Sequence, residues 1–267
     1  MTTAFVLRRA FQAVLPATLL LAACGKDDKP ADPVPVVDQG RIKVHHAAAS
    51  ANVPVKFLFD DVEKATLSYE LNSSYSGYQA VNTGSRSIKV NVAASGTTAT
   101  SQNVTVEKDR NYSYFAYANS GSGVAGLFIP DDLTPPASGK AKIRLVHLAQ
   151  GTSNPLKLSS ESIAGLIDVN NINVVVANYT PIPPATTPPA GSTVGASSFV
   201  EIPAGPYNIA ITYGSPSVAV THVGDGSGSG TGTKNYEAGK IYTVVFRGSS
   251  ALLDPALQPK AVVISNN

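Results

Sequence analysis

An internal repeat constrains the fold of this chain more than any other feature of its sequence. Residues 41–48 align without a gap with residues 142–149, at an offset of 101 positions. Each segment precedes a Pro-led apolar run, which begins at Pro54 in the first copy and at Pro155 in the second. A chain that contains one unit twice is expected to fold as two similar domains in tandem.

The offset between matching segments grows along the chain, to 121 and then to 130 positions. A Pro-, Thr- and Gly-rich segment over residues 181–195 explains the first increase, and a Gly-rich segment over residues 224–232 explains the second. Insertions are tolerated in surface loops, so both segments are expected to connect strands. The expected organisation is domain 1 over residues 40–136, a hinge at Pro135-Pro136, and domain 2 over residues 140–267 with a loop insertion at about 180–195.

Apolar residues alternate with other residues in both copies. Ile42, Val44 and His46 would share one face of a strand, and the residues between them would share the other. Short β-rich runs are separated by Gly, Asn and Pro at spacings close to those of β-sandwiches. No run after residue 23 has the period of a sustained amphipathic helix. The pattern predicts an all-β chain with two tandem immunoglobulin-like or transthyretin-like β-sandwich domains.

The first 23 residues have the layout of a secretory signal peptide. Two arginines precede a largely apolar run over residues 10–21, which is too short for a stable membrane-spanning helix. The run ends in the sequence LAAC, which resembles the lipobox of bacterial lipoproteins. That resemblance implies cleavage between Ala23 and Cys24, and lipidation of Cys24. Cys24 is the single cysteine of the chain, so no disulfide is expected.

Residues 24–39 are rich in Pro, Lys and Asp, which predicts a flexible tether between the lipid and the first domain. Gly25 follows the cysteine, whereas Asp at that position favours retention in the inner membrane. Residues 26–28 resemble the acidic export tag of surface lipoproteins in some Gram-negative bacteria. We therefore expect a lipid-anchored protein of the cell outer membrane, exposed at the cell surface. The periplasmic face is the alternative location.

The charge of the chain argues against a nucleic-acid partner. The sequence has 20 Lys and Arg against 18 Asp and Glu, and cleavage after residue 23 removes two arginines and no acid. The expected mature chain therefore carries 18 residues of each sign. Nonspecific nucleic-acid binding needs a basic patch, and no cluster of Lys and Arg is present in the sequence.

Fragments of both copies resemble a known family. In each copy a first strand ends in His-x-Ala and a Pro-led strand follows, and the closest fragments are AGPY at residues 204–207 and AGKIYT at residues 238–243. In this order they are similar to the bacterial family catalogued as domain of unknown function 4397, here in tandem over most of residues 40–267. Residues 83–85 depart from the usual Ala-Gly-x-Tyr of that family. The resemblance implies an exported β-sandwich module and brings no known catalytic residues.

His46 and His147 occupy the same position in the two copies, which invites a metal-binding or catalytic interpretation. A metal-bound histidine usually has a carboxylate that orients it, and none can be identified nearby. The adjacent His45 points to the opposite face of the strand and cannot chelate with His46. We expect both repeated histidines to bond backbone groups at strand ends, and we expect no metal and no cofactor.

Catalytic patterns are lacking in the sequence. No Gly-x-Ser-x-Gly elbow joins a strand to a helix, and no helix follows the Gly-rich run at residues 224–230 to bind a phosphate. That run is expected to be a hairpin connection. The acid pairs Asp60-Asp61 and Asp131-Asp132 are expected to form turns. The alternative for Asp131-Asp132 is a calcium site at the domain junction.

Tyrosines are the candidate ligand contacts, namely Tyr75, Tyr78, Tyr112 and Tyr114. Tyr112 and Tyr114 would share one face of a strand whose other face is also aromatic, so one of the two rows would be free to face solvent. A Tyr ring offers a flat face and a hydroxyl to a glycan or a peptide. Core packing with a hydrogen bond like that of a tyrosine corner is the alternative role.

Together these features predict a non-catalytic, lipid-anchored protein of the cell envelope. Its expected role is surface display, adhesion or binding of an extracellular polymer or protein, and its expected partners are the membrane and a glycan or an envelope protein. One alternative is an accessory or catalytic subunit in the processing of envelope or extracellular polysaccharide. Another is a subunit of an envelope complex that pairs through an exposed edge strand.

Overall fold

The computed structural model describes most of the chain that follows the tether. The described residues are 37–70, 73–119, 123–152, 156–161, 167–168, 174–176, 194–213 and 218–267. Residues Val37–Asn267 form one compact unit. The expected signal peptide, Ala23, Cys24, nearly all of the tether and most of the segment 181–195 lie outside the described residues. Among those that are described, no helix has the length and hydrophobicity to span a membrane.

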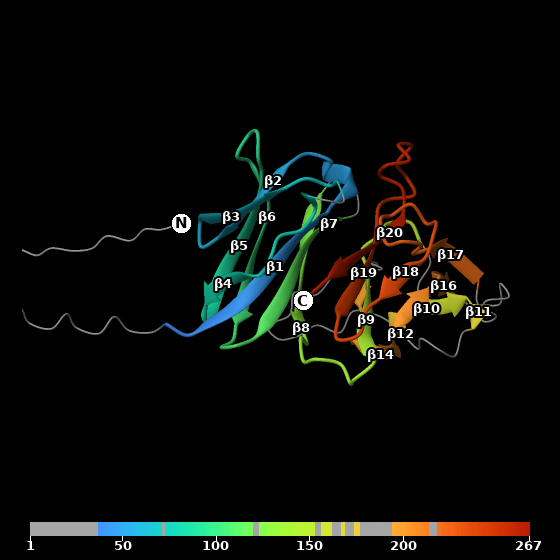
Figure 1. Ribbon diagram of the computed structural model, residues 1–267. Helices are drawn as coiled ribbons and strands as arrows, with labels where there is room; N and C mark the ends of the chain where they lie inside the picture. The colour runs from blue at the N-terminus through green and yellow to red at the C-terminus, as the bar shows by residue number, and fades with distance from the viewer. Residues whose placement is uncertain are drawn as a thin grey trace, which may run out of the picture. The chain divides into compact units, whose positions relative to one another are not determined.

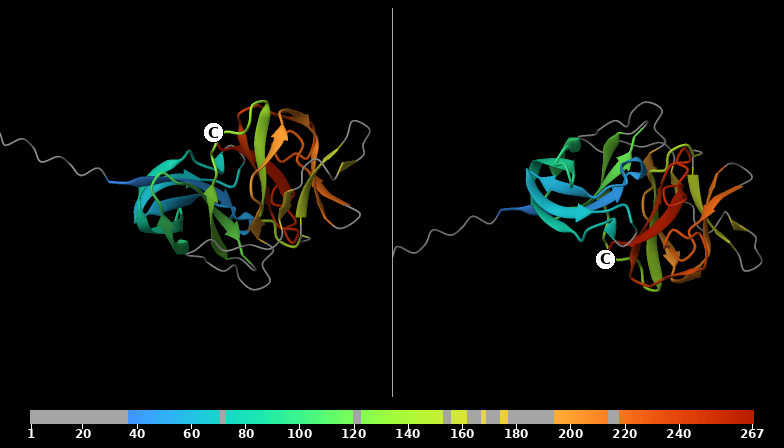
Figure 2. Two further views of the ribbon diagram at one scale, coloured as in Figure 1. Left: turned by 90° about the horizontal axis from the view of Figure 1, so that it is seen from below. Right: turned by 90° about the horizontal axis from the view of Figure 1, so that it is seen from above.

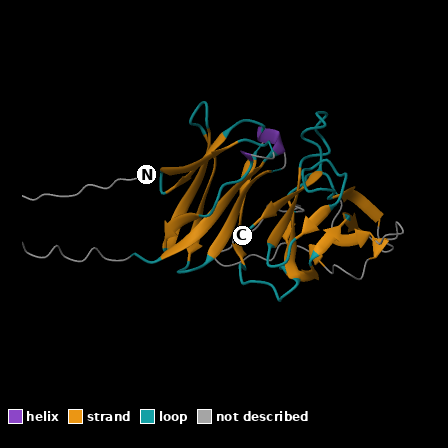
Figure 3. Ribbon diagram, in the orientation of Figure 1, coloured by secondary structure: helices purple, strands orange, loops and turns teal. Residues whose placement is uncertain are grey.

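The first half of the described chain forms a β-sandwich of two four-stranded sheets (Figure 1). Sheet I has the order β4-β1-β7-β8, with β1 at Gln39–Ala47, β4 at Gln79–Asn82, β7 at Asn111–Ala118 and β8 at Val124–Asp131. Sheet II has the order β3-β2-β5-β6, with β2 at Val55–Phe59, β3 at Val62–Leu67, β5 at Gly84–Val92 and β6 at Thr98–Val106. A short 3-10 helix, η1, occupies Ala49–Ala51 (Figure 3). The apolar core between these sheets includes Val44, Phe57, Ile88 and Tyr114.

The second half repeats this arrangement. Sheet III has β9 at Lys140–His147, β13 at Gly195–Ala196, β14 at Val200–Pro203, β19 at Ile241–Arg247 and β20 at Lys260–Ser265. Sheet IV has β10 at Leu156–Glu161, β11 at Ile167–Asp168, β12 at Val174–Val176, β16 at Ile209–Tyr213 and β17 at Val218–His222. A small two-stranded sheet pairs β15, Gly205–Tyr207, with β18, Lys234–Tyr236. The core between sheets III and IV includes Leu145, Leu158, Ile211 and Phe246.

Strand register shows that the two sandwiches are copies of one unit. In sheet I, β1 runs parallel to β7 with Ile42 opposite Tyr112. In sheet III, β9 runs parallel to β19 with Ile143 opposite Tyr242. These pairs match at the offsets of 101 and 130 that relate the two segments in sequence. The prediction of an all-β chain with two tandem sandwiches is therefore confirmed.

Sheets I and III pack face to face, so the four sheets stack in the order II, I, III and IV (Figure 2). A separate apolar cluster joins Phe115 and Leu127 of sheet I to Val146 and Val245 of sheet III. Val194 also belongs to this cluster, although it fell at the end of the expected insertion. Such burial of apolar area stabilises the contact and opposes independent rotation of the sandwiches about Pro135-Pro136.

Candidate functional site

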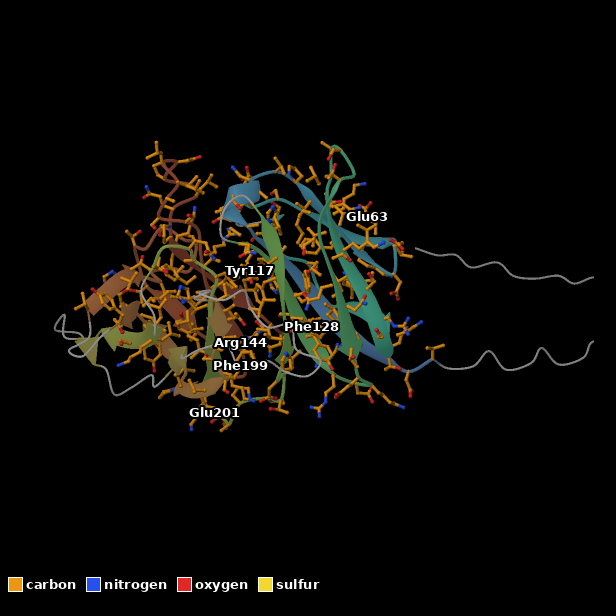
Figure 4. All side chains as sticks on the ribbon, turned by 180° about the vertical axis from the view of Figure 1, so that it is seen from behind. Glu63, Tyr117, Phe128, Arg144, Phe199 and Glu201 are labelled. Atoms are coloured by element: carbon orange, nitrogen blue, oxygen red, sulfur yellow. The ribbon has the colours of Figure 1, made fainter. Side chains whose placement is uncertain are left out.

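Arg144, on β9, lies at the junction between sheets I and III (Figure 4). Its side chain is almost completely buried. Its guanidinium forms an ion pair with Asp131, the last residue of β8. It also donates to the Pro130 carbonyl at 3.0 Å and to Thr243 Oγ1 at 3.0 Å. A buried charge is costly unless it is paired and hydrogen-bonded. Arg144 meets this condition only because the second sandwich sits against the end of β8 in the first.

Asp131 is equally enclosed. Besides Arg144, its carboxylate accepts hydrogen bonds from the Tyr78 hydroxyl at 2.6 Å and from Ser113 Oγ at 2.7 Å. Asp131 is therefore the end of a strand whose carboxylate is committed to these donors, and the turn prediction for it is wrong. The role of Asp131 could not be recognised from the sequence, because its partner Arg144 belongs to the other sandwich.

Lys43 is the counterpart of Arg144 in the repeat and makes an equivalent contact. Its Nζ donates to the Ser265 carbonyl at 2.7 Å. Ser265 lies opposite Tyr242 in sheet III, as Pro130 lies opposite Tyr112 in sheet I. Burial lowers the pKa of Lys43 to about 8, with Asp131 opposing the shift and Arg144 adding to it. In each sandwich, a cationic side chain on the first strand thus donates to a backbone carbonyl on the last strand of the other sandwich. The junction therefore has approximate two-fold symmetry.

A serine and an aromatic residue are also repeated beside these cations. Ser76 Oγ accepts from the Val44 amide at 3.1 Å, and Ser197 Oγ accepts from the Leu145 amide at 2.9 Å. Two residues after these serines, Tyr78 lies against Lys43 at 5.2 Å and Phe199 lies against Arg144 at 4.4 Å, measured from the cation to the ring centre. The hydroxyl of Tyr78 reaches Asp131, whereas Phe199 has no hydroxyl to make a matching bond.

A cleft of about 910 Å³ opens where the two sandwiches and their linker meet. Its lining includes Arg41, Arg110 and Asn111 from the first sandwich, Asp132 from the linker, and Ser198 and Phe199 from the second sandwich. Arg41 Nε donates to Asn111 Oδ1 at 2.8 Å, which holds the two side chains together at the rim. The cleft is a product of the tandem arrangement, because neither sandwich alone provides its walls.

Two of the three aspartates at the cleft, Asp131 and Asp132, are paired with cations. Asp132 Oδ2 lies 2.9 Å from Lys142 Nζ. Hydrogen bonding from the Thr134 hydroxyl and then from Lys142 lowers the pKa of Asp132 to about 2. The whole lining contains three arginines and three aspartates, which are Arg41, Arg110, Arg144, Asp109, Asp131 and Asp132. The lining therefore presents equal numbers of arginines and aspartates.

The tyrosines singled out from the sequence divide into two pairs. Tyr112 and Tyr114 lie in the core of the first sandwich, so the prediction of a solvent-facing row on β7 is wrong. Sheet II covers one face of this strand and sheet III covers the other. The Tyr112 hydroxyl accepts from the Glu107 amide at 3.2 Å, as the alternative role required. Tyr75 is 37% exposed and Tyr78 half-buried, and ligand contact by these two remains a prediction.

The repeated histidines have structural partners. His46 Nε2 bonds the Val53 carbonyl at 3.0 Å, and His147 Nε2 bonds Thr152 Oγ1 at 2.8 Å. Burial is the main cause that lowers the pKa of each ring to about 4. Bonding to a backbone group is thus confirmed for His46, while the ring of His147 bonds a side chain. In the described part of the chain, no three His, Cys, Asp or Glu residues gather as a metal site would require.

The turn prediction for the first acid pair is confirmed. Asp60 and Asp61 adopt positive φ angles of 48° and 66° and form the turn between β2 and β3. The Gly-rich run at residues 224–230 connects β17 to β18, and no helix follows it. These two strands belong to different sheets, because β17 pairs with β16 and β18 pairs with β15, so the prediction of a hairpin connection is wrong. Asp225 Oδ1 orders this connection by accepting from the Ser227 amide at 2.8 Å.

Comparisons with known proteins identify a related family but give no information on a ligand. No curated protein sequence matches the chain. Among solved structures, the CBM26-family domain CBMbc of Eubacterium rectale Amy13K, in complex with maltoheptaose, has 9% identity and a TM-score of 0.26, over 84% of this chain and 96% of that chain. A candidate cell adhesion protein from Bacteroides eggerthii has 13% identity and a TM-score of 0.19, over 86% of this chain and 95% of that chain. With TM-scores this low, neither similarity informs the function.

The family comparison covers the first sandwich and the first strand of the second. Residues 40–154 match the model of a family described as "Domain of unknown function (DUF4397)". The matched segment includes β1 to β8 and also β9, which carries Arg144. Over these residues, the chain resembles the DUF4397 family.

Proposed function

We propose that this chain is a non-catalytic, lipid-anchored protein of the cell envelope that binds an extracellular polymer or protein at the junction cleft. The lipobox-like sequence at residues 21–24 supports the anchor, and Gly25 and the tether support display on the outer membrane. The observation that carries the binding role is the cleft itself, which is built jointly by two packed sandwiches and is lined by polar side chains and by one aromatic side chain, Phe199. Concave sites of this kind occur preferentially where two domains meet.

The chemistry of the acids supports binding over catalysis. A polysaccharide-processing site needs a carboxyl group that holds a proton near neutral pH. The carboxylate of Asp132 has a pKa of about 2 and stays ionised, and Asp131 serves as the counter-ion of buried Arg144. Both acids at the domain junction are therefore committed to charge pairing.

Capture of envelope material by the immobilised chain tests the binding role. Ser198→Trp places a bulky ring on an exposed residue of the cleft lining, and Val62→Trp adds the same ring on the exposed β3 edge, away from the cleft. We expect Ser198→Trp to lose the captured material and Val62→Trp to retain it. Equal capture by both variants would show that the cleft is not the binding surface.

Protease shaving of intact cells tests the location, with detection of a tag at the C-terminus. Loss of the tag is expected if both sandwiches lie outside the cell. Protection from the protease would place them in the periplasm and would favour a subunit of an envelope complex.

A further inference from the structure

We propose that the junction cleft binds a neutral oligosaccharide, with the ring of Phe199 as the surface on which a sugar stacks. This inference rests on the proposed binding function and names the class of ligand. It follows from three properties of the cleft, which are its size, its aromatic wall and its charge balance.

The size of the cleft suits a segment of a glycan chain. Its volume of about 910 Å³ lies toward the upper end of the range for small-molecule sites, which is roughly 300–1,000 Å³. The cleft is bounded by both sandwiches and by the linker at residues 132–134, and Arg41 and Ser198 at its wall are exposed to solvent. Each sandwich therefore contributes a solvent-exposed residue to the cleft wall.

Phe199 provides an aromatic surface that is held in place. Ser197, two residues earlier, is fixed by the bond from the Leu145 amide to its Oγ, and this hydroxyl in turn donates to the Ser198 carbonyl at 2.9 Å. The guanidinium of Arg144 packs against the ring at 4.4 Å, while the residue remains half-buried at the cleft wall. A ring fixed in this way loses little further entropy on binding, which favours stacking with the apolar face of a sugar.

Polar groups on the same cleft lining as Phe199 have the planar geometry that pairs of neighbouring hydroxyls can bond. Arg41 has a guanidinium with five N–H donors, of which the bond to Asn111 uses one. The amide of Asn111 and the carboxylate of Asp132 add donors and acceptors on the same cleft. Hydroxyl groups can both donate to the carboxylate and accept from the guanidinium, so a sugar can use groups of either charge.

Charge balance selects a neutral glycan over an acidic one. The lining holds three arginines and three aspartates, and Arg144 is already paired with Asp131. Asp132 is likewise paired with Lys142, which leaves Asp109 on the same lining as Arg41 and Arg110. The Asp109 carboxylate would oppose a carboxylate or sulfate that approached these arginines, because like charges oppose binding. An anionic polymer would instead need an excess of cations along its path.

Calorimetric titration of the chain over residues 24–267 tests this assignment. The variant Cys24→Ala provides soluble protein, and the probes are neutral oligosaccharides of glucan, mannan, galactan and xylan, with oligogalacturonate and alginate as acidic probes. We expect at least one neutral probe to bind, with an affinity that is insensitive to NaCl from about 50 to about 500 mM. Failure of every neutral probe, or stronger and salt-sensitive binding of an acidic probe, would overturn the proposal.

Matched variants locate the binding. Phe199→Ala is expected to weaken binding by about tenfold or more, which corresponds to about 1.4 kcal/mol. Tyr213→Ala removes an aromatic side chain that is 39% exposed on sheet IV, and it should leave the affinity unchanged. Arg41→Gln changes an exposed side chain at the rim and should also weaken binding, so the test stands even if Phe199→Ala unfolds. Unchanged affinity in both cleft variants would refute the site.

The outcome separates this inference from the proposed function. If no oligosaccharide binds but Ser198→Trp still abolishes capture of an envelope protein, the cleft is a binding site and the ligand class is wrong. If no oligosaccharide binds and Ser198→Trp captures as much as Val62→Trp does, both the ligand class and the binding role of the cleft are wrong.

Discussion

The buried pair between Arg144 and Asp131 gives the sharpest test of how the two sandwiches are held together. Asp131→Asn removes the negative charge and leaves the guanidinium of Arg144 without its counter-ion, since both side chains are at most 2% exposed. Removal of one partner from a buried pair typically costs about 3–5 kcal/mol. Arg144 keeps its bonds to the Pro130 carbonyl and Thr243 Oγ1, so the loss should fall at the lower end, about 3 kcal/mol.

The neighbouring Asp132→Asn is the matched control. Asp132 pairs with Lys142, but its side chain is 55% exposed, so solvent screens the interaction. Exposed pairs contribute about 1 kcal/mol or less. The same chemical change, one residue away, should therefore cost much less than Asp131→Asn.

Urea-induced unfolding of the chain over residues 24–267, carrying Cys24→Ala, provides the measurement. A loss of about 3 kcal/mol should also lower Tm by about 6–12 °C in a chain of this size. In a double-mutant cycle, Asp131→Asn and Arg144→Met should show a coupling energy of about 2–3 kcal/mol. The reasoning is refuted if Asp131→Asn destabilises the chain no more than Asp132→Asn does, or if the cycle shows no coupling.

Further predictions concern the core, the histidines and the anchor. Tyr114→Phe removes a buried hydroxyl without a hydrogen-bond partner in the described structure, so the free energy of unfolding should stay equal or rise by up to about 1 kcal/mol, whereas Tyr112→Phe should lower it by about 1 kcal/mol in the same urea assay. His46 and His147 have pKa values of about 4 in the folded chain and about 6.5 when unfolded, so the unfolded state binds protons first as the pH falls. Stability should therefore be full above about pH 6.5 and decrease toward pH 4 by up to about 3 kcal/mol for each ring, and His46→Asn should flatten the plot of Tm against pH. Cys24→Ala should release the chain from membranes in cell fractionation, and persistent membrane association would contradict lipid anchoring.

The repeat and the alternation of residues were enough to predict the all-β class and the two sandwiches. The repeat and the alternation can both be recognised without knowledge of tertiary contacts. An alternation with a period of two indicates the two faces of a strand, whatever the position of that strand in the fold. The turn at Asp60 and Asp61 and the bond from His46 to a backbone carbonyl were predictable for the same reason, because each depends on residues within a short stretch of chain.

The role of the second face of β1, β7 and β9 was not predictable from these patterns. Lys43 and Arg144 occupy alternate positions on their strands, and such positions usually indicate a face exposed to water. In the structure they are buried, because sheet I packs on sheet III. One signal was available, since a cation recurs at this position in both copies. Its meaning depends on a partner strand in the other sandwich.

The sequence by itself determined the all-β class and the presence of two sandwiches, because strand periodicity and the order of the repeated segments can be read directly along the chain. Only the tertiary structure decided how the sandwiches meet, which buries Asp131 with Arg144 and brings Arg41 within one cleft with Phe199. The physical reason is that packing between two sheets joins residues distant in sequence, and its geometry depends on shape and charge across the whole contact. The candidate site lies at that contact, so it could be identified only from the tertiary structure.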